Sequence, residues 1–334
     1  MLVLSLSHCA SSQLTSTEWQ SPLLQAHPLV GQIWRVHDRR FIDVATLQKE
    51  VSRADYLLLG EKHDNPDHHL LRQQLVMQLQ PEIALVSFEM LDHSQQPQLD
   101  ALAGANPESA DIRAALDWDD EGWNWDFYGP LLSALLAEGV SVRAANISRA
   151  DEMEAYAGEL NQTAATVLTP EQLLVLEQEI DASHCGMLPA SQFAAMVRVQ
   201  QARDYHMAGS LLGDLSSSSE SGINQSGSNE SAGGEERPVA GVRVLVAGNY
   251  HVRKDLGVPK YLQALYIQAL DMQALDTQTL SDNADVVLTV AFLEVAETMT
   301  DPQMYLETQY AADAFDYVWF TPAAAAQDYC AAFQ

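Results

Sequence analysis

Two short segments of the same form, Gly60-Glu61-Lys62-His63 and Gly248-Asn249-Tyr250-His251, each follow an apolar run typical of a buried strand. A strand that ends in Gly and then presents His places the imidazole at the carboxyl edge of a sheet. In α/β proteins that edge is where ligands bind. Because two such segments occur far apart in one chain, we predict that they form two walls of a single pocket.

The rest of the chain alternates strand-like and helix-like segments. Strands are predicted over 30–36, 56–60, 84–89, 140–145, 242–247, 286–292 and 317–320, and helices over 44–53, 65–80, 125–138, 170–185 and 190–212. Continuous apolar strands that alternate with helices are typical of parallel sheets covered on both faces. The sequence therefore predicts an α/β fold with a mostly parallel central sheet flanked by helices.

Two segments are interpreted as insertions in one domain. Residues 216–236 are almost entirely Ser, Gly, Asn and Glu, which cannot bury a core, so we expect a mobile surface loop. Residues 263–280 repeat Gln-Ala-Leu or Gln-Thr-Leu every five residues, a period that suits neither a helix nor a strand cleanly; we expect an irregular helix. Residues 1–27 are expected to be a signal or lipoprotein remnant and linker, and 28–334 the domain.

The charge balance excludes one class of partner. Acidic residues number 46 against 17 basic ones, giving a net charge of −29, which repels nucleic acid. Lysine is scarce, yet Lys62, Lys254 and Lys260 lie in or just beyond the two Gly-x-x-His segments, and Arg253 adds a further cation there. This clustering indicates a local pocket for an anionic group; chance clustering of solvated lysines is the alternative.

The N-terminus and the cysteines bear on location. The run from Met1 to Cys9 resembles the end of a secretory signal before a lipid-modified cysteine, although it is short and His8 stands where a small residue is expected. We expect Cys9 to carry a lipid anchor; an ordinary cytosolic N-terminus is the alternative. The other cysteines are Cys185 and Cys330, and the odd count of three argues against a complete disulfide framework.

Carboxylates accompany the histidines. Glu61 and Glu89 end predicted strands, where a carboxylate can orient His63, ligate a metal or act as a general base. Together with His251 they form a candidate site for a divalent metal. The sequence has no Gly-x-Ser-x-Gly, Walker A, Gly-x-Gly-x-x-Gly or His-Glu-x-x-His pattern.

Three tyrosines lie near charged or aromatic groups: Tyr250, Tyr128 and Tyr205. A tyrosinate is a known axial ligand of ferric haem, and a neighbouring cation favours the phenolate form. The aromatic segment 118–128 is either a surface for a flat ligand or simple core. His68 and His69, at the start of a predicted helix, face either the pocket or solvent.

Several of these segments together resemble the ChaN-type haem-binding lipoprotein family. They are residues 60–69, Trp125-x-x-Tyr128-x-Pro130-Leu131, Arg203-Asp204-x-x-Met207-Ala208, and residues 248–259. That family belongs to a superfamily that includes the Tiki proteases and the erythromycin esterases. The resemblance covers roughly residues 28–321. The chain departs from the family in its two insertions and in its poor lipidation signal.

The resemblance implies a haem-binding protein of the bacterial envelope, on the periplasmic side and anchored by lipid, that acts in haem and iron uptake rather than as an enzyme. It implies a homodimer that encloses two haems face to face, with an outer-membrane haem receptor as partner. In this family a tyrosine of one subunit ligates the iron, while a histidine and a lysine of the other hold the propionates.

Carried to this chain, the resemblance implies a tyrosine on the iron, with Tyr250 ranked before Tyr128 and Tyr205. The residues expected to bind propionates or line the pocket are Lys62, His63, His251, Arg253 and Lys254. A metal-dependent hydrolase that uses Glu61, His63, Glu89 and His251 stays open as the alternative.

Overall fold

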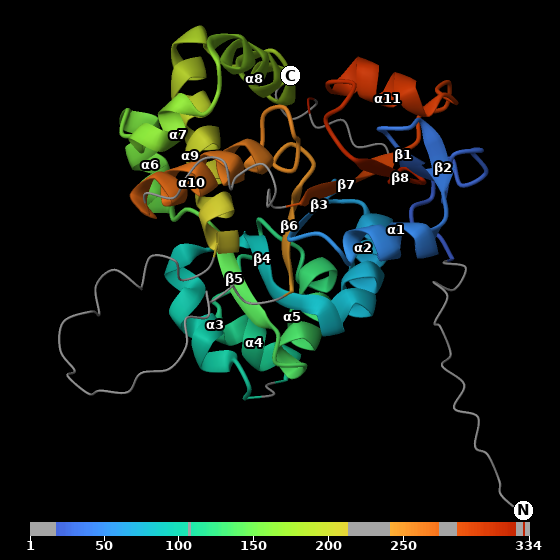
Figure 1. Ribbon diagram of the computed structural model, residues 1–334, viewed down its shortest axis with the longest axis horizontal. Helices are drawn as coiled ribbons and strands as arrows, with labels where there is room; N and C mark the ends of the chain where they lie inside the picture. The colour runs from blue at the N-terminus through green and yellow to red at the C-terminus, as the bar shows by residue number, and fades with distance from the viewer. Residues whose placement is uncertain (1–17, 106–107, 213–240, 274–285, 325–329, 331–334) are drawn as a thin grey trace, which may run out of the picture.

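The computed structural model describes residues 18–105, 108–212, 241–273, 286–324 and 330. An eight-stranded sheet runs through the molecule with helices on both faces (Figure 1), which confirms the predicted α/β fold. The strands are β1 (Ile33–Arg35), β2 (Arg40–Ile42), β3 (Tyr56–Glu61), β4 (Ile83–Asp92), β5 (Ser141–Asn146), β6 (Val242–Gly248), β7 (Val287–Glu294) and β8 (Tyr317–Thr321).

The strand order explains why two distant segments meet. The order is β2-β1-β8-β7-β3-β6-β4-β5, in which the strands from β8 to β5 are mutually parallel and β1 is antiparallel to both of its neighbours. β3 lies directly beside β6, and Glu61 is in register with Gly248. Both Gly-x-x-His segments therefore leave the sheet at the same carboxyl edge, on adjacent strands.

Two helical layers cover the sheet. The helices are α1 (Val44–Val51), α2 (Pro66–Leu79), α3 (Gln96–Leu102), α4 (Ser109–Ala115), α5 (Trp125–Ala137), α6 (Arg149–Ala157), α7 (Gln162–Thr166), α8 (Pro170–Ser183), α9 (Phe193–Leu212), α10 (Val258–Gln273) and α11 (Pro302–Gln309). Side chains alternate along β3: Leu57 and Leu59 join the core under α1, α2 and α5, whereas Tyr56 and Leu58 join the core under α8, α9 and α10.

Local sequence fixes the start of α2 and so the position of His63. The Asn65 side chain accepts hydrogen bonds from the backbone N–H groups of Asp67 and His68, at 2.9 and 3.3 Å, and Pro66 occupies the first turn. Asn65 also donates to Glu294 Oε1 at 2.8 Å, which ties the loop to the end of β7. His63 consequently lies in the short loop between β3 and α2.

The first turn of α2 differs from one expectation. His68 and His69 are buried, so the solvated-face alternative is wrong. His68 Nε2 lies 2.8 Å from Thr321 Oγ1, and the His69 ring stacks on Phe127 with centroids 4.4 Å apart. The reason is that the sheet edge and α5 enclose this turn. Of the aromatic segment, Trp118, Trp125 and Tyr128 are core residues.

The folded unit extends N-terminally of residue 28. Ser21 is completely buried, and the backbone N–H groups of Gln20 and Ser21 each donate to Asp67 at 2.9 Å. The Gln-Ala-Leu repeat begins within α10, which is helical to Gln273. The remainder of the repeat, the 216–236 segment between α9 and β6, and Cys9 lie outside the described residues.

Two of the three cysteines form a disulfide that the odd cysteine count did not suggest. Cys185, just after α8, is bonded to Cys330, 145 residues further along the chain. An odd count is compatible with one bridge when the remaining cysteine has another role, as Cys9 was expected to have. Within the described part of the chain, no helix has the length and apolar character needed to cross a membrane.

Candidate functional site

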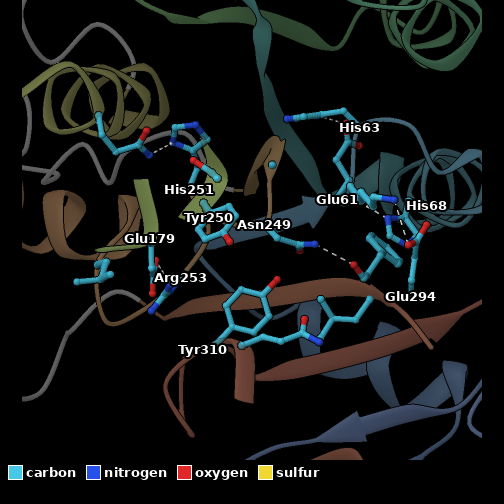
Figure 2. Close-up of a pocket in the computed structure, with 18 of the residues that line it drawn as sticks. Glu61, His63, His68, Glu179, Asn249, Tyr250, His251, Arg253, Glu294 and Tyr310 are labelled. Carbon is cyan, nitrogen blue, oxygen red and sulfur yellow. Dashed lines mark hydrogen bonds and ion pairs between the residues drawn. The ribbon is translucent and has the colours of Figure 1, made fainter. Parts of the chain in front are cut away.

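A cavity of about 710 Å³ opens at the carboxyl edge of β3, β6 and β7. Its walls come from these strand ends, from the loop after β6, from α8 and α9, and from Tyr310 after α11 (Figure 2). The apolar part of its lining includes Leu176, Ile180, Leu256, Phe292, Leu293 and Val295. The cavity therefore combines a hydrophobic surface with polar groups from both Gly-x-x-His segments, the composition usual for ligand sites.

The predicted pair of histidines and pair of glutamates converge at this edge. His63 Nδ1 lies 3.3 Å from Glu61 Oε1, and His251 Nε2 lies 3.3 Å from Glu89 Oε1. Glu89 also accepts a hydrogen bond from the backbone N–H of Gly248 at 2.7 Å, which links β4 to the end of β6. The expectation that these four residues share one sheet edge is confirmed.

Glu61 is the centre of a buried network. Arg72 from α2 forms an ion pair with one carboxylate oxygen, and the Tyr128 hydroxyl donates to the other at 2.6 Å. Burial acts to raise the pKa of Glu61, but the positive charges of Arg72 and His69 outweigh it and hold that pKa well below the usual range. Burial and the Glu61 charge raise the pKa of Tyr128, so its hydroxyl stays protonated and donates.

His63 carries this network to the cavity. Its side chain is 41% exposed. Burial acts to lower its pKa, but the hydrogen bond with Glu61 and the charge of Glu89 outweigh that effect and raise it. A Cβ atom added at Gly248 would lie 2.9 Å from His63 Nε2, so the glycine leaves room for the imidazole. His63 is thus a partly exposed side chain at the cavity wall whose protonated form is favoured.

His251 lies between two carboxylates. Its Nδ1 atom is 2.5 Å from Asp204 Oδ1 of α9, and Gln200 Nε2 approaches the same nitrogen at 3.1 Å. Burial acts to lower the pKa of His251, but Glu89 and Asp204 together raise it to about 10. Burial likewise acts to raise the pKa of Glu89, but His251 outweighs it and lowers that pKa to about 2. The floor of the cavity therefore holds a buried imidazolium at neutral pH.

The three candidate tyrosines lie in different environments. Tyr250 lines the cavity and is 48% exposed. Tyr128 is buried against Glu61, and Tyr205 does not line the cavity. Tyr310, which the sequence reasoning missed, also lines the cavity, with its ring centroid 6.1 Å from that of Tyr250. Burial and the Glu179 charge raise the pKa of Tyr250 against the opposing effect of Arg253, so the phenol is neutral in the free protein.

The basic side chains near the cavity are already paired with carboxylates, which the sequence did not suggest. Arg253 is buried, and its guanidinium pairs with Glu179 and Asp255. Lys62 Nζ lies 3.1 Å from Glu294 Oε2 and 3.3 Å from Asp64 Oδ1. Acidic side chains from α8, β7 and the loops therefore pair with these cations, which their clustering in the sequence did not indicate.

Lys254 lies outside the cavity lining, with its Nζ atom 2.6 Å from Asp316 Oδ1. Its position in the sequence, three residues after His251, suggested a place in the pocket. The loop after β6 turns away from the cavity at this point, and the lysine reaches the residue that precedes β8 instead.

The side chains of the alternative metal site already contact other groups of the protein. Arg72 and Tyr128 engage the carboxylate oxygens of Glu61, and Asp204 and Glu89 engage the two nitrogens of His251. In the chain as far as the structure describes it, no group of three or more His, Cys, Asp or Glu side chains is arranged to hold a metal ion.

Comparison with known proteins places this architecture in a family. A protein-family model described as "Haem-binding uptake, Tiki superfamily, ChaN" matches residues 47–262. The match covers more than half of the chain, so the protein belongs to the ChaN family of haem-binding uptake proteins, and haem is its cofactor. A search of curated proteins finds no match.

One solved structure in particular shares the fold. ChaN of Campylobacter jejuni, whose structure shows cofacial haem binding, superimposes with a TM-score of 0.63 at 21% identity, covering 86% of this chain and 95% of that one. A mutant of the erythromycin esterase EreC in its open conformation gives 0.40 at 13% identity, covering 75% of this chain and 73% of that one. The first similarity supports the fold, and the second is too low to support an argument.

Proposed function

We propose that the protein binds haem in the cavity at the carboxyl edge, with Tyr250 as the iron ligand, and that it acts in bacterial haem uptake. The observation that carries this proposal is the half-exposed phenol of Tyr250 at the mouth of a largely apolar cavity, in a chain of the ChaN family. Ferric haem supplies the positive charge that favours a phenolate ligand.

Tyr250 is better suited to this role than the other tyrosines. The Tyr128 hydroxyl already donates to Glu61, and Tyr205 does not line the cavity. Tyr310 is held under the Arg253 guanidinium, 5.4 Å from its ring centroid. A half-exposed ring can turn toward a ligand without breaking a buried contact, and this favours Tyr250 over Tyr310.

The propionate contacts proposed here are His63 and Lys62. Both side chains are more than one-third exposed at the cavity wall, at 41% and 36%. A charge-assisted hydrogen bond to a carboxylate is roughly twice as strong as a neutral one. His251 and Arg253 are buried and engaged by carboxylates, so they support the wall rather than contact the ligand.

We further propose that two copies of the chain enclose the haem, because Tyr250 leaves nearly half of its surface uncovered in one copy. Lys254 lies outside the cavity of its own chain, so a propionate contact at this lysine requires haem held by a second copy. Light-scattering mass measurement with and without hemin tests the assembly. A mass that stays monomeric at saturating hemin rejects the dimer.

The proposed location is the periplasmic side of the bacterial envelope, with Cys9 as the lipid anchor and an outer-membrane haem receptor as the source of haem. The Cys185–Cys330 disulfide supports an oxidising compartment. Fractionation of cells that express the wild type and a Cys9→Ala variant tests the anchor. Release of the variant into the soluble periplasm is expected, and a soluble wild type contradicts the anchor.

Hemin titration tests the central proposal. The wild type is expected to show a shifted Soret band and the charge-transfer bands of a tyrosinate ligand. Tyr250→Phe should lose those bands while keeping its melting temperature, since a half-exposed hydroxyl contributes little to folding. Tyr310→Phe and Tyr205→Phe are the matched controls and should keep the bands. Loss of the bands in Tyr310→Phe alone would move the ligand to that residue.

A further inference from the structure

A carboxylate of the protein lies in the cavity beside a side chain proposed above to bind a propionate. Glu294, the last residue of β7, lines the cavity, and its Oε2 atom lies 3.1 Å from Lys62 Nζ. Figure 2 shows Glu294 on the side of the cavity away from Glu179 and Arg253, which pair with each other. Glu294 and Lys62 therefore form a separate ion pair in the wall of the ligand space.

The two carboxylate oxygens of Glu294 have different partners. Oε1 accepts hydrogen bonds from the Asn65 side-chain amide at 2.8 Å and from the backbone N–H of Ala324 at 2.9 Å. Asn65 is completely buried, and its side-chain oxygen caps α2, so this donor is fixed in position. Oε2 pairs with Lys62. The position of Glu294 is thus set through Oε1 and does not depend on where the lysine lies.

The lysine end of the pair is the adaptable one. The side chains of Lys62 and Glu294 are 36% and 20% exposed, and a partly exposed ion pair of this kind changes an equilibrium constant by no more than about fivefold. Lysine carries three donors on a flexible stem, so its ammonium can turn from one carboxylate to another. Lys62 also pairs with Asp64 at 3.3 Å, but Asp64 does not line the cavity. Of these two acids, Glu294 is the one that shares the ligand space.

We propose, on the basis of the haem site proposed above, that Glu294 competes with a haem propionate for Lys62. Glu294 holds the lysine in the free protein and is displaced from it when haem binds. A propionate and the Glu294 side chain carry the same charge and the same acceptor atoms, so each opposes the binding of the other at one ammonium group. The exchange replaces one charge-assisted contact by another.

This competition lowers the affinity for haem and gives the site a route to release. As the propionate leaves, Lys62 returns to Glu294, whose position is kept by Asn65 and Ala324. The ammonium group is paired with a carboxylate in both states, so the protein does not have to solvate it anew when haem departs. Glu294 is therefore a residue that weakens binding of porphyrins with propionate groups, although it lies in the wall of the site.

Titrations with hemin and with hemin dimethyl ester, which has no carboxylates, test this role in the full-length protein. Glu294→Gln removes the charge and keeps an oxygen that can accept from Asn65. We expect it to bind hemin about fivefold more tightly than the wild type and to bind the ester equally well. Asp64→Asn is the matched control, which removes the other acid from Lys62, and should change hemin affinity less than about twofold. In a Lys62→Gln background, Glu294→Gln should have no effect.

Cross-linking of the wild type tests the displacement without any substitution. A carbodiimide joins paired amines and carboxylates directly, and mass spectrometry of the resulting peptides identifies each pair. We expect a Lys62–Glu294 cross-link in the free protein and its loss at saturating hemin, with an amide between Lys62 and a hemin propionate in its place. Hemin dimethyl ester should leave the cross-link unchanged. The Lys254–Asp316 pair, which lies outside the cavity, is the internal standard in dilute protein.

The failure of this proposal can be told from the failure of the haem site. Absence of a Soret shift with both hemin and its ester overturns the haem site and the competition together. Hemin binding that is equal or weaker in Glu294→Gln, or a gain that persists in the Lys62→Gln background, overturns the competition alone. If Glu294→Gln does not fold, as judged by circular dichroism, the wild type decides: a Lys62–Glu294 cross-link that survives saturating hemin rejects the displacement.

Discussion

Asp204 Oδ1 lies 2.5 Å from His251 Nδ1, and the two side chains are buried together at the floor of the cavity. Glu89 approaches the other ring nitrogen at 3.3 Å. An imidazolium between two carboxylates links α9, β4 and the loop after β6 through one ring. Because both nitrogens are engaged, His251 supports the geometry of the site rather than reaching into the ligand space.

This arrangement predicts a pH-dependent contribution of His251 to stability. Its folded pKa of about 10 lies above the ordinary value of 6.5, so the stabilisation is complete below about pH 6.5 and is lost as pH rises toward 10. His251→Gln should lower the free energy of unfolding by about 3–5 kcal/mol near pH 6. The deficit should shrink as pH approaches 10, measured by urea unfolding at several pH values.

His37→Gln is the control for the pH experiment, because the His37 side chain is 86% exposed. Its effect should be small at every pH. The groups that face His251 from neighbouring elements are Glu89, Asp204, Gln200 and His63. Of these, His63 is the one that carries a like charge when both rings are protonated. A deficit for His251→Gln that does not change between about pH 6 and 10 would contradict a buried imidazolium.

Because the ion pair between Arg72 and Glu61 is buried, losing the arginine alone should cost much more stability than losing an arginine from an exposed pair. Arg72→Met removes the cation and leaves the Glu61 carboxylate buried, at a cost of about 3–5 kcal/mol. Arg40→Met is the matched change on an exposed pair, Arg40–Asp38, and should cost no more than about 1 kcal/mol. Adding Glu61→Gln to Arg72→Met should recover part of the loss. Equal losses of unfolding free energy for Arg72→Met and Arg40→Met, measured in urea, would show that burial does not determine the strength of these ion pairs.

The sequence was sufficient to place residues whose position follows from strand order. Two strand–Gly-x-x-His segments predicted a common sheet edge, and β3 and β6 prove to be adjacent. It was not sufficient for residues that arrive from helices. Arg72 and Gln200 reach the site from the middle of α2 and α9, where nothing in the spacing distinguishes them from other helical positions.

Ion pairing was the other property that the sequence could not show. Lysine and arginine near the histidines suggested a cationic pocket, but two of the balancing acids, Glu179 and Glu294, are far from them in the chain. The pairing follows from how α8 and β7 pack against the loops. The Cys185–Cys330 bond was hidden for the same reason, since 145 residues separate its ends.

Close packing of the loop after β6 predicts a strong effect at one glycine. A Cβ atom at Gly257 would overlap the backbone carbonyl of His251, which accepts a hydrogen bond from Val258 N at 2.7 Å. Gly257→Ala should therefore destabilise the fold by about 1–3 kcal/mol. Gly209→Ala is the control: this helical glycine has open space around it and should gain about 0.5–1 kcal/mol. Thermal melting that ranks the two variants in the opposite order would contradict this packing.

The two lysines near the Gly-x-x-His segments differ in their position relative to the cavity. Lys62 lines the cavity, whereas the Lys254 amine lies outside it, 2.6 Å from Asp316. If Lys62 holds a propionate, Lys62→Gln should weaken hemin binding about tenfold, the value of one charge-assisted hydrogen bond. Lys254→Gln and Lys49→Gln should bind as the wild type does when the protein is diluted below its dimerisation concentration. Melting temperatures check that none of the three changes acts through folding. A larger loss for Lys254→Gln than for Lys62→Gln at high protein concentration would assign the propionate to a lysine of the opposite copy, and equal affinities for all four proteins would remove lysine from haem recognition.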